Sequence, residues 1–156
     1  MTLYPGPDSS PGFLLWRVTL HWQRLVTEAL RPFNLTHVQF ALLSSAWWLS
    51  RADRDGQDGQ DGPEGSSPNQ LAIAAQAGTN VKMTSEVLRK LEDKGLIVQR
   101  TDPGDRRAKS VTITPEGIRL AEQAVVAVER VDAAFFSAAP SSVVGALQAL
   151  ARFDPP

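Results

Sequence analysis

Two short helical segments joined by a tight glycine turn constrain the fold of this chain more than any other feature. The first, predicted over residues 69–77, has Asn69 as its N-cap, and the second, over residues 80–94, starts at the cap Asn80 and ends before Gly95. In the second segment, residues at i, i+3, i+4 and i+7 share one face, which predicts its buried side. These residues are Thr84, Val87, Leu88 and Leu91.

A β-hairpin is predicted directly after the two helices. Residues 97–101 and 109–114 are rich in β-branched side chains and flank the segment DPGDRRA, which contains turn residues and two arginines. A helix, a turn, a second helix and a hairpin, in that order, are typical of the winged helix-turn-helix. We therefore expect residues 69–114 to form a winged helix-turn-helix DNA-binding region.

The rest of the chain is predicted to be helical. In the helix over residues 13–30, one face contains Leu14, Val18 and Trp22, while Trp16 and Leu20 lie nearly opposite, so this helix needs two burial partners. Further helices are predicted after the capping box that begins at Thr36, after Pro115, and over residues 143–153. The expected fold class is mainly α with a small β-hairpin wing, in one unit.

The segment RADRDGQDGQDGPEGSSP, residues 51–68, interrupts this helical pattern. It consists mainly of Gly, Asp, Ser, Pro and Gln, so it cannot bury enough apolar surface to offset the entropy lost on ordering. We expect a flexible acidic Gly-rich insertion.

Composition excludes several functional classes. The chain has no cysteine and only two histidines, which argues against disulfides, thiol chemistry, a histidine-rich metal site and a metal cofactor. The first twelve residues lack the pattern of a signal peptide, and no apolar run approaches the ~20 residues that span a bilayer. The sequence thus predicts a cytoplasmic protein without a membrane segment or cofactor.

Charge is distributed unevenly along the chain. The formal net charge is only -1, yet residues 79–109 contain eight cationic residues and five acidic ones, a local net charge of +3, while the remainder nets -4. Phosphate contacts need local cations and not a basic protein overall. A protein of this composition can therefore bind duplex DNA through that segment.

The predicted helix over residues 80–94 has a polar outer face. Turning the apolar residues inward leaves Asn80, Lys82, Ser85, Glu86 and Arg89 outward, which suits the major groove of DNA. The alternative interpretation is a solvated helix face. Similarly, Arg106 and Arg107 at the hairpin tip can reach a minor groove or lie on an ordinary surface.

The segment LAIAAQAGTNVKMTSEVLRKLEDKGLIVQRTDPGDRRAKSVTITPEGIRLAE resembles the DNA-binding core of the MarR family, the multiple antibiotic resistance regulators. The order and spacing of LEDKGLI, DPGDRRA and VTITPEG support the resemblance, and the DRR wing with its following T-x-x-G is the most specific part. The resemblance extends more weakly over residues 14–136.

The resemblance implies a transcriptional regulator that acts as a homodimer, often a repressor, on a pseudo-palindromic DNA site. Residues 13–50 and 115–153 would then form the helical dimerisation region. Two departures from relatives are the acidic insertion and the presence of Val81 and Glu86 in the recognition helix. By position, the residues implied to contact DNA are Asn80, Lys82, Met83, Ser85 and Arg89 in the helix, and Asp105, Arg106, Arg107 and Lys109 in the wing.

Many members of the family bind a small molecule, often an anionic aromatic compound, between the dimerisation helices and the winged unit. This implies a possible small-molecule effector for the chain. The candidate lining residues are Trp16, His21, Trp22, His37, Phe40 and Trp47. The alternative interpretation is that the histidines are structural and the aromatic residues form core.

Two other functional classes remain as alternatives. A winged helix can act as a protein–protein interaction module, but the outer face of such a module is expected to be hydrophobic, whereas this one is polar and cationic. An enzyme is not expected, because the sequence has no nucleophile–base set, phosphate loop or metal-ligand spacing.

Overall fold

A computed structural model describes residues 3–55, 67–101 and 109–154 of the chain. It confirms the predicted fold class, a mainly helical chain with one β-hairpin. The elements are α1 (Pro11–Leu30), η1 (Arg31–Phe33), α2 (His37–Asp55), α3 (Gln70–Ala77), α4 (Val81–Asp93), β1 (Ile97–Thr101), β2 (Lys109–Ile113), α5 (Pro115–Phe136) and α6 (Val143–Ala151).

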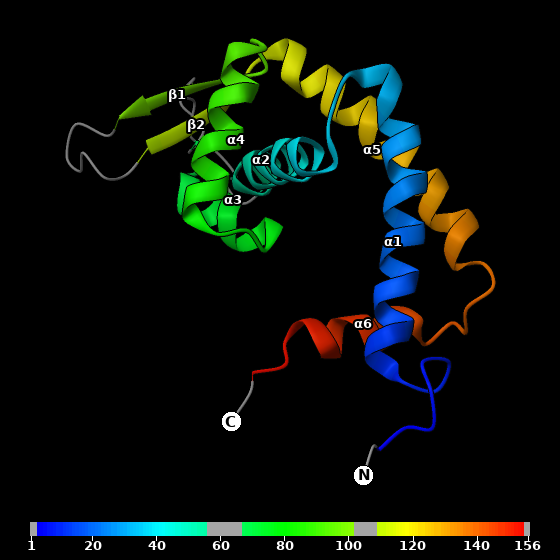
Figure 1. Cartoon of the computed structure of the whole chain (residues 1–156). Coiled ribbons are helices and arrows are strands. Elements are labelled where there is room, and N and C mark those ends of the chain that lie inside the picture. Colours follow the sequence, from blue (N-terminus) through cyan, green and yellow to red (C-terminus); the bar gives the residue numbers. More distant parts are fainter. Residues whose placement is uncertain (1–2, 56–66, 102–108, 155–156) are drawn as a thin grey trace.

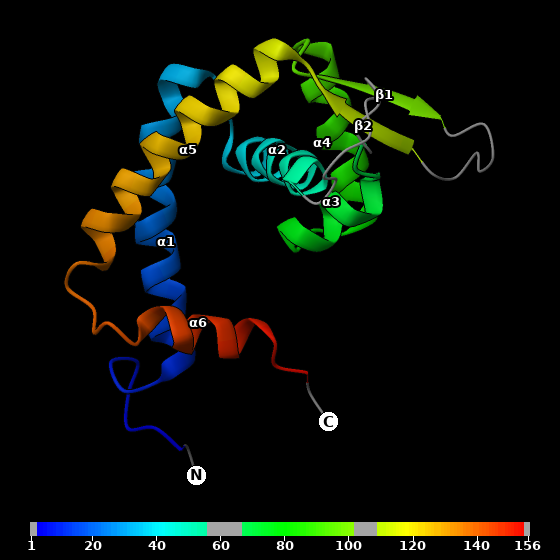
Figure 2. The ribbon, with the colours of Figure 1, turned by 180° about the vertical axis from the view of Figure 1, so that it is seen from behind.

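The long helices α1 and α5 lie side by side, as both ribbon views show (Figures 1 and 2). At one end of this pair, α2, α3, α4 and the hairpin form a unit that we call the winged unit. The short helix α6 lies near the other end of the pair, close to the start of α1 (Figure 1). The described chain therefore curves around an open side, between the winged unit and α6.

Local capping interactions determine where the helices of the winged unit begin. The side chains of Asn69 and Asn80 accept hydrogen bonds from the backbone N–H groups of Ala72 and Met83, each at 2.8 Å. Each bond satisfies one of the unpaired donors at a helix N-terminus. Both caps are at the residues that the sequence predicts.

One continuous core joins the winged unit to the paired helices. In α4, Thr84, Leu88 and Leu91 are fully buried and Val87 is partly buried, which confirms the predicted inner face. Leu42 and Leu43 of α2 are also fully buried, and α2 contacts α1, α3, α4, α5 and β2. The second helix thus lies at the centre of the fold.

The hairpin is antiparallel, with Ile97 opposite Ile113 and Thr101 opposite Lys109. The residues directly before α3 pair with the outer side of β2. Asn69 forms a bridge with Ser110, and the backbone N–H of Val111 donates to the carbonyl oxygen of Pro68 at 2.9 Å. These two backbone contacts attach the hairpin to the start of α3.

The predicted insertion over residues 51–68 is too long at both ends. Helix α2 continues to Asp55, and Pro68 is buried beside β2. The guanidinium carbon of Arg51 lies 4.8 Å from the centre of the Trp47 ring, one helical turn earlier. This cation–π contact favours the extra helical turn despite the polar sequence. Residues 56–66 lie outside the described residues.

Helix α1 starts at Pro11, two residues before the predicted start, and within the described residues only its second half contains buried side chains. Val26 and Leu30 are buried against α2 and α5, but Trp16 is 62% exposed and Leu15 is 54% exposed. None of the residues of α6 is buried, and Leu150 is 65% exposed. No helix within the described ranges is both long and apolar enough to span a membrane.

Candidate nucleic-acid interface

The turn between α3 and α4 holds the start of α4 in a defined position. Gly78 adopts a positive φ of 67°, which ends α3. The hydroxyl groups of Thr79 and Thr84 lie 2.7 Å apart, and Thr84 also donates to the carbonyl oxygen of Asn80 at 2.9 Å. The amide of Gln70 donates to the carbonyl oxygen of Val81 at 3.3 Å. These bonds fix the first turn of α4 against α3.

The outer face of α4 presents the predicted polar side chains. Lys82, Met83 and Arg89 are exposed, and Ser85 is partly buried. Asn80 is exposed as well, but its side-chain oxygen already caps α4. Asn80 therefore has a structural function whether or not its amide group also meets a ligand.

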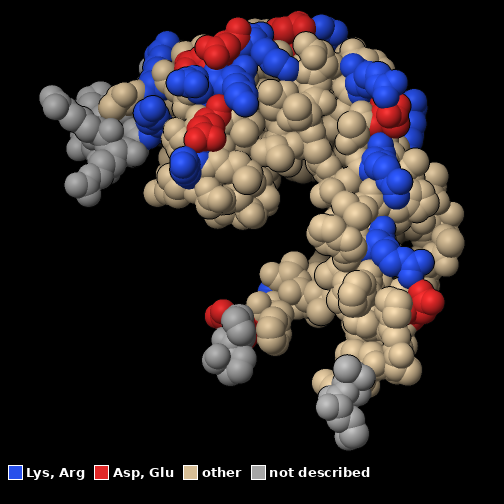
Figure 3. Space-filling model, viewed as in Figure 1, with Lys and Arg blue, Asp and Glu red and all other residues tan. Residues whose placement is uncertain are grey.

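The strands of the wing place further cations beside α4. Lys109 is exposed at the start of β2, and Arg100 is exposed on the neighbouring strand, opposite Ser110. Figure 3 shows Lys and Arg side chains gathered over α4 and the hairpin, with Asp and Glu side chains among them. Arg100 contributes to the local positive charge but is not among the predicted site residues. The predicted Asp105, Arg106 and Arg107 lie outside the described residues.

The carboxylate of Glu92 joins the end of α4 to the wing. It accepts hydrogen bonds from the backbone N–H of Gln99 at 2.7 Å and from the side-chain amide of Gln99 at 3.0 Å. Two bonds from one charged group restrict the angle between helix and hairpin. The outer face of α4 and the exposed side of the hairpin are thereby held in one arrangement.

The T-x-x-G motif after the hairpin has a clear structural reason. Thr114 caps α5 by accepting from the backbone N–H of Gly117 at 3.0 Å, and its hydroxyl group lies within hydrogen-bond distance of the carbonyl oxygens of Gly95 and Leu96. A Cβ atom at Gly117 would lie only 2.0 Å from the carbonyl oxygen of Leu96. Only glycine allows the start of α5 to approach the end of α4 this closely.

Two of the predicted effector residues, Trp22 and His37, meet where α1, α2 and α5 converge, and a third, His21, contacts α5 nearby. The indole N–H of Trp22 donates to the Asp132 carboxylate at 2.7 Å, and the ring of His37 stacks edge-on at 4.9 Å from that of Trp22. Burial lowers the pKa of His37, and the negative charge of Asp132 opposes this shift. One helical turn further along α5, Phe135 contacts the ring of His21 at 5.4 Å.

The other three predicted effector residues are dispersed. Trp47 is buried and Phe40 packs against the core, whereas Trp16 is largely exposed on α1. The single chain therefore does not gather the six residues around one cavity. Among the described residues, no group of three acidic or histidine side chains is placed to hold a metal ion.

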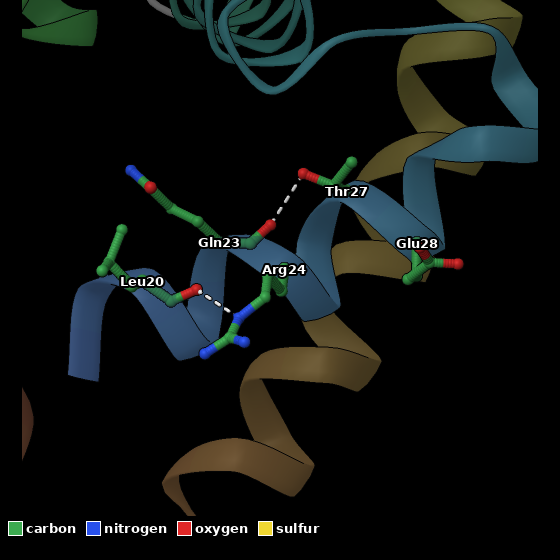
Figure 4. A pocket seen from close by; sticks show the side chains of 5 residues that line it. All are labelled: Leu20, Gln23, Arg24, Thr27 and Glu28. Atoms are coloured by element: carbon green, nitrogen blue, oxygen red, sulfur yellow. Dashed lines mark hydrogen bonds between the residues drawn. The ribbon is translucent and has the colours of Figure 1, made fainter. Parts of the chain in front are cut away.

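Two open hollows occur elsewhere on the described surface. The larger, of about 740 Å³, lies along α1, and its lining residues are Leu20, Gln23, Arg24, Thr27 and Glu28 (Figure 4). The smaller, of about 430 Å³, lies between the turn η1 and α5, and its lining residues are Phe33, Glu122, Gln123 and Val126. None of the six predicted effector residues lines either hollow.

Comparisons with known proteins agree with this geometry. A family model described as the MarR family matches residues 64–109, from the segment before α3 to the start of β2. The chain is 40% identical to the HTH-type transcriptional regulator YdcH of Bacillus subtilis over 136 aligned residues. This alignment covers 87% of this chain and 84% of the relative.

Two further relatives are more distant. The HTH-type transcriptional repressor Rv2887 of Mycobacterium tuberculosis is 30% identical over 129 residues, covering 81% of this chain and 79% of the relative. The crystal structure of CouR from Rhodococcus jostii, bound to p-coumaroyl-CoA, superimposes with a TM-score of 0.73 and 28% identity, covering 96% of this chain and 94% of that one.

Proposed function

The chain belongs to the MarR family of transcriptional regulators, and we propose that it is a homodimeric repressor that binds a pseudo-palindromic operator. The observation that carries this proposal is the polar, cationic outer face of α4, held rigidly between α3 and the wing. In this proposal the protein is cytoplasmic and acts by binding DNA, not by catalysing a reaction.

The face of α4 suits the major groove of duplex DNA. Arg89 is exposed on the side away from the buried Leu88 and Leu91, and a guanidinium group can bind the edge of guanine with two hydrogen bonds. Lys82 in the first turn and Lys109 at the start of β2 are exposed cations suited to phosphate groups. We assign base reading to Arg89 and Ser85, and phosphate contacts to the two lysines.

The exposed apolar side chains of α1 and α6 support the homodimer. Residues along the first half of α1 and most of α6 are exposed in the single chain, although the transfer of apolar side chains out of water is favourable. A second copy of the chain supplies the same apolar surfaces with twofold symmetry. The main exposed apolar residues are Phe13, Leu14, Leu15, Trp16, Val18, Val144, Leu147, Leu150 and Phe153.

A small-molecule effector is the second part of the proposal. The CouR structure, bound to p-coumaroyl-CoA, shows that a relative of similar fold binds an aromatic anionic molecule. In this chain the junction of Trp22, His37 and Asp132 joins both long helices to the winged unit, so a ligand beside it could change the orientation of α4. We propose this junction as the part of the protein that responds to the effector.

The first experiment is an in vitro selection of genomic DNA fragments bound by the purified protein, at moderate and at high salt. The proposal predicts a pseudo-palindromic motif with half-sites about one helical turn apart. Recovery of no motif would contradict the proposal and would favour a protein–protein interaction module instead.

Two variants then test the DNA face. Arg89→Ala should weaken binding to the selected operator about tenfold or more, since a good base contact contributes roughly 1–3 kcal/mol. Arg130→Ala removes the same charge from the exposed side of α5 and is the control, with affinity expected to stay within about twofold. Equal affinity in the two variants would exclude the outer face of α4 as the DNA-binding surface.

A further inference from the structure

Lys94 occupies the C-terminal end of the recognition helix and has a fixed direction. It is the C-cap of α4, and Gly95 follows with a positive φ of 71°. The backbone N–H groups of Gly95 and Leu96 return to the carbonyl oxygens of Glu92 and Leu91 at 2.8 and 3.0 Å. This closed turn fixes the backbone position from which the Lys94 side chain extends.

The ammonium group of Lys94 contacts a distant part of the chain. Its Nζ donates to the backbone carbonyl oxygen of Asn34 at 2.5 Å and to Oε1 of Gln39 at 3.0 Å. These acceptors precede Lys94 by 60 and 55 residues. Lys94 is thus one of the eight cations counted in the segment over residues 79–109. It is exposed like several of the others, but its ammonium group is hydrogen-bonded to two protein oxygens.

The acceptors belong to the corner that joins α1 to α2, residues 31–39. Asn34 has a positive φ of 51° and caps the turn η1. Gln39 is 6% exposed, and its Oε1 also accepts the backbone N–H of Thr36 at 3.2 Å in the capping box of α2. Leu35, between them, is buried. The corner is therefore a rigid anchor at the end of the long helix α1.

We propose that Lys94 is a positioning residue that sets the orientation of the recognition helix relative to the long helix α1, through the corner over residues 31–39. This inference rests on the proposed DNA-binding function, because orientation matters only when two recognition helices must fit one operator. Lys94 does not contact DNA phosphate in this proposal.

The orientation of α4 matters because a dimeric DNA-binding protein must fit both halves of its operator at once. Each subunit must place its α4 in a major groove, and the two grooves of an operator lie about 34 Å apart along the DNA. If α1 takes part in dimerisation, a change of the angle between α4 and α1 alters the separation of both recognition helices. Non-specific DNA, which is bound through phosphates, imposes no such separation.

The test compares Lys94→Met, Lys94→Arg and the control Lys90→Met, which removes an exposed lysine from the same helix. We expect Lys94→Met to weaken operator binding by about fivefold to tenfold, in the usual range for coupling between sites. Affinity for random-sequence DNA and the dependence of binding on salt should not change. Lys94→Arg, which keeps a long cationic donor, should restore operator binding to within about threefold of wild type.

Two results would overturn the proposal. The first is a loss of affinity for operator and random DNA alike, with a salt slope shallower by about 0.9, as expected when one phosphate contact is lost. The second is operator affinity equal to that of wild type. If Lys94→Met does not fold, Lys94→Gln replaces it in the test, because its shorter neutral side chain cannot reach both acceptors. The same two results would then overturn the proposal.

Hydrogen exchange of the free protein separates this proposal from the DNA-binding proposal. Lys94→Met should increase amide exchange over residues 34–39, whereas Lys90→Met should not. Unchanged exchange there would exclude the contact as a constraint, even if the protein binds DNA. Absence of operator binding by the wild-type protein would instead refute the DNA-binding proposal. The exchange measurement would still test whether Lys94 constrains residues 34–39 in the free protein.

Discussion

Replacing Gly117 by alanine tests the close approach between the start of α5 and the end of α4. An added Cβ would lie 2.0 Å from the carbonyl oxygen of Leu96 and 2.9 Å from Cγ1 of Ile113. The nearest contact is a backbone atom, which cannot rotate away. Helix α5 must therefore move from the residues that connect α4 to β1.

The size of the effect follows from the bonds at this point. The Leu96 carbonyl oxygen accepts from the backbone N–H of Thr114 at 3.0 Å and lies 3.1 Å from its hydroxyl group. Losing both interactions costs about 2 kcal/mol, and overpacking adds about 1–3 kcal/mol. Alanine offsets about 1 kcal/mol of this through its higher helix propensity. We expect a net loss of about 2–4 kcal/mol.

Thermal unfolding at one fixed protein concentration measures this loss, because the stability of a dimer depends on concentration. For a chain of this length the predicted Tm decrease is roughly 5–15 °C. Gly12→Ala is the matched control, since Gly12 also lies in the first turn of a helix that begins with a proline and has open space around its Cβ position. A Tm for Gly117→Ala equal to that of Gly12→Ala would refute the reasoning.

Three further predictions address other contacts. The folded-state pKa of His37 lies below its ordinary value of 6.5, so its contribution to the free energy of unfolding is present above that pH and is lost as pH falls toward the folded-state pKa. Chemical denaturation at about pH 7.5 and 5 should show a smaller decrease for His37→Gln than for wild type, and equal decreases would contradict this. Glu92→Ala should speed amide exchange at Gln99 and destabilise the protein by about 1–2 kcal/mol. Protection of the Gln99 amide as in wild type would contradict the proposed effect of the two hydrogen bonds from Gln99 to Glu92. Asn69→Ala should cost about 1 kcal/mol in denaturant unfolding through loss of the α3 cap, whereas Asn69→Ser should be nearly neutral.

Much of the winged unit could be predicted because its signals are local. Asn69, Asn80 and Thr114 each bond to a backbone N–H three residues later, so a short stretch of sequence contains the complete interaction. The buried face of α4 follows from helical periodicity in the same way. The DNA-binding residues assigned to that helix stay a prediction, although the structure shows most of them exposed.

Two features of the long helices did not follow from the sequence. Asp132 interrupts the apolar pattern of α5, and nothing nearby explains it, because its partner Trp22 lies 110 residues away. Helix α2 also ends later than predicted, because the polar composition after residue 50 favours a loop, whereas the contact of Arg51 with Trp47, one helical turn earlier, favours continuation of the helix.

The sequence by itself therefore determined the helices of the winged unit, their caps, the hairpin and the fold class, because these depend on bonds and periodicities within a few residues. Only the tertiary structure decided which exposed charged side chains also bond to distant parts of the chain. Lys94 and Arg89 are equivalent in a count of charge and both are exposed, yet the ammonium group of Lys94 bonds to the corner between α1 and α2. The direction of a long side chain at a helix end depends on acceptors that the fold brings from 55 to 60 residues away.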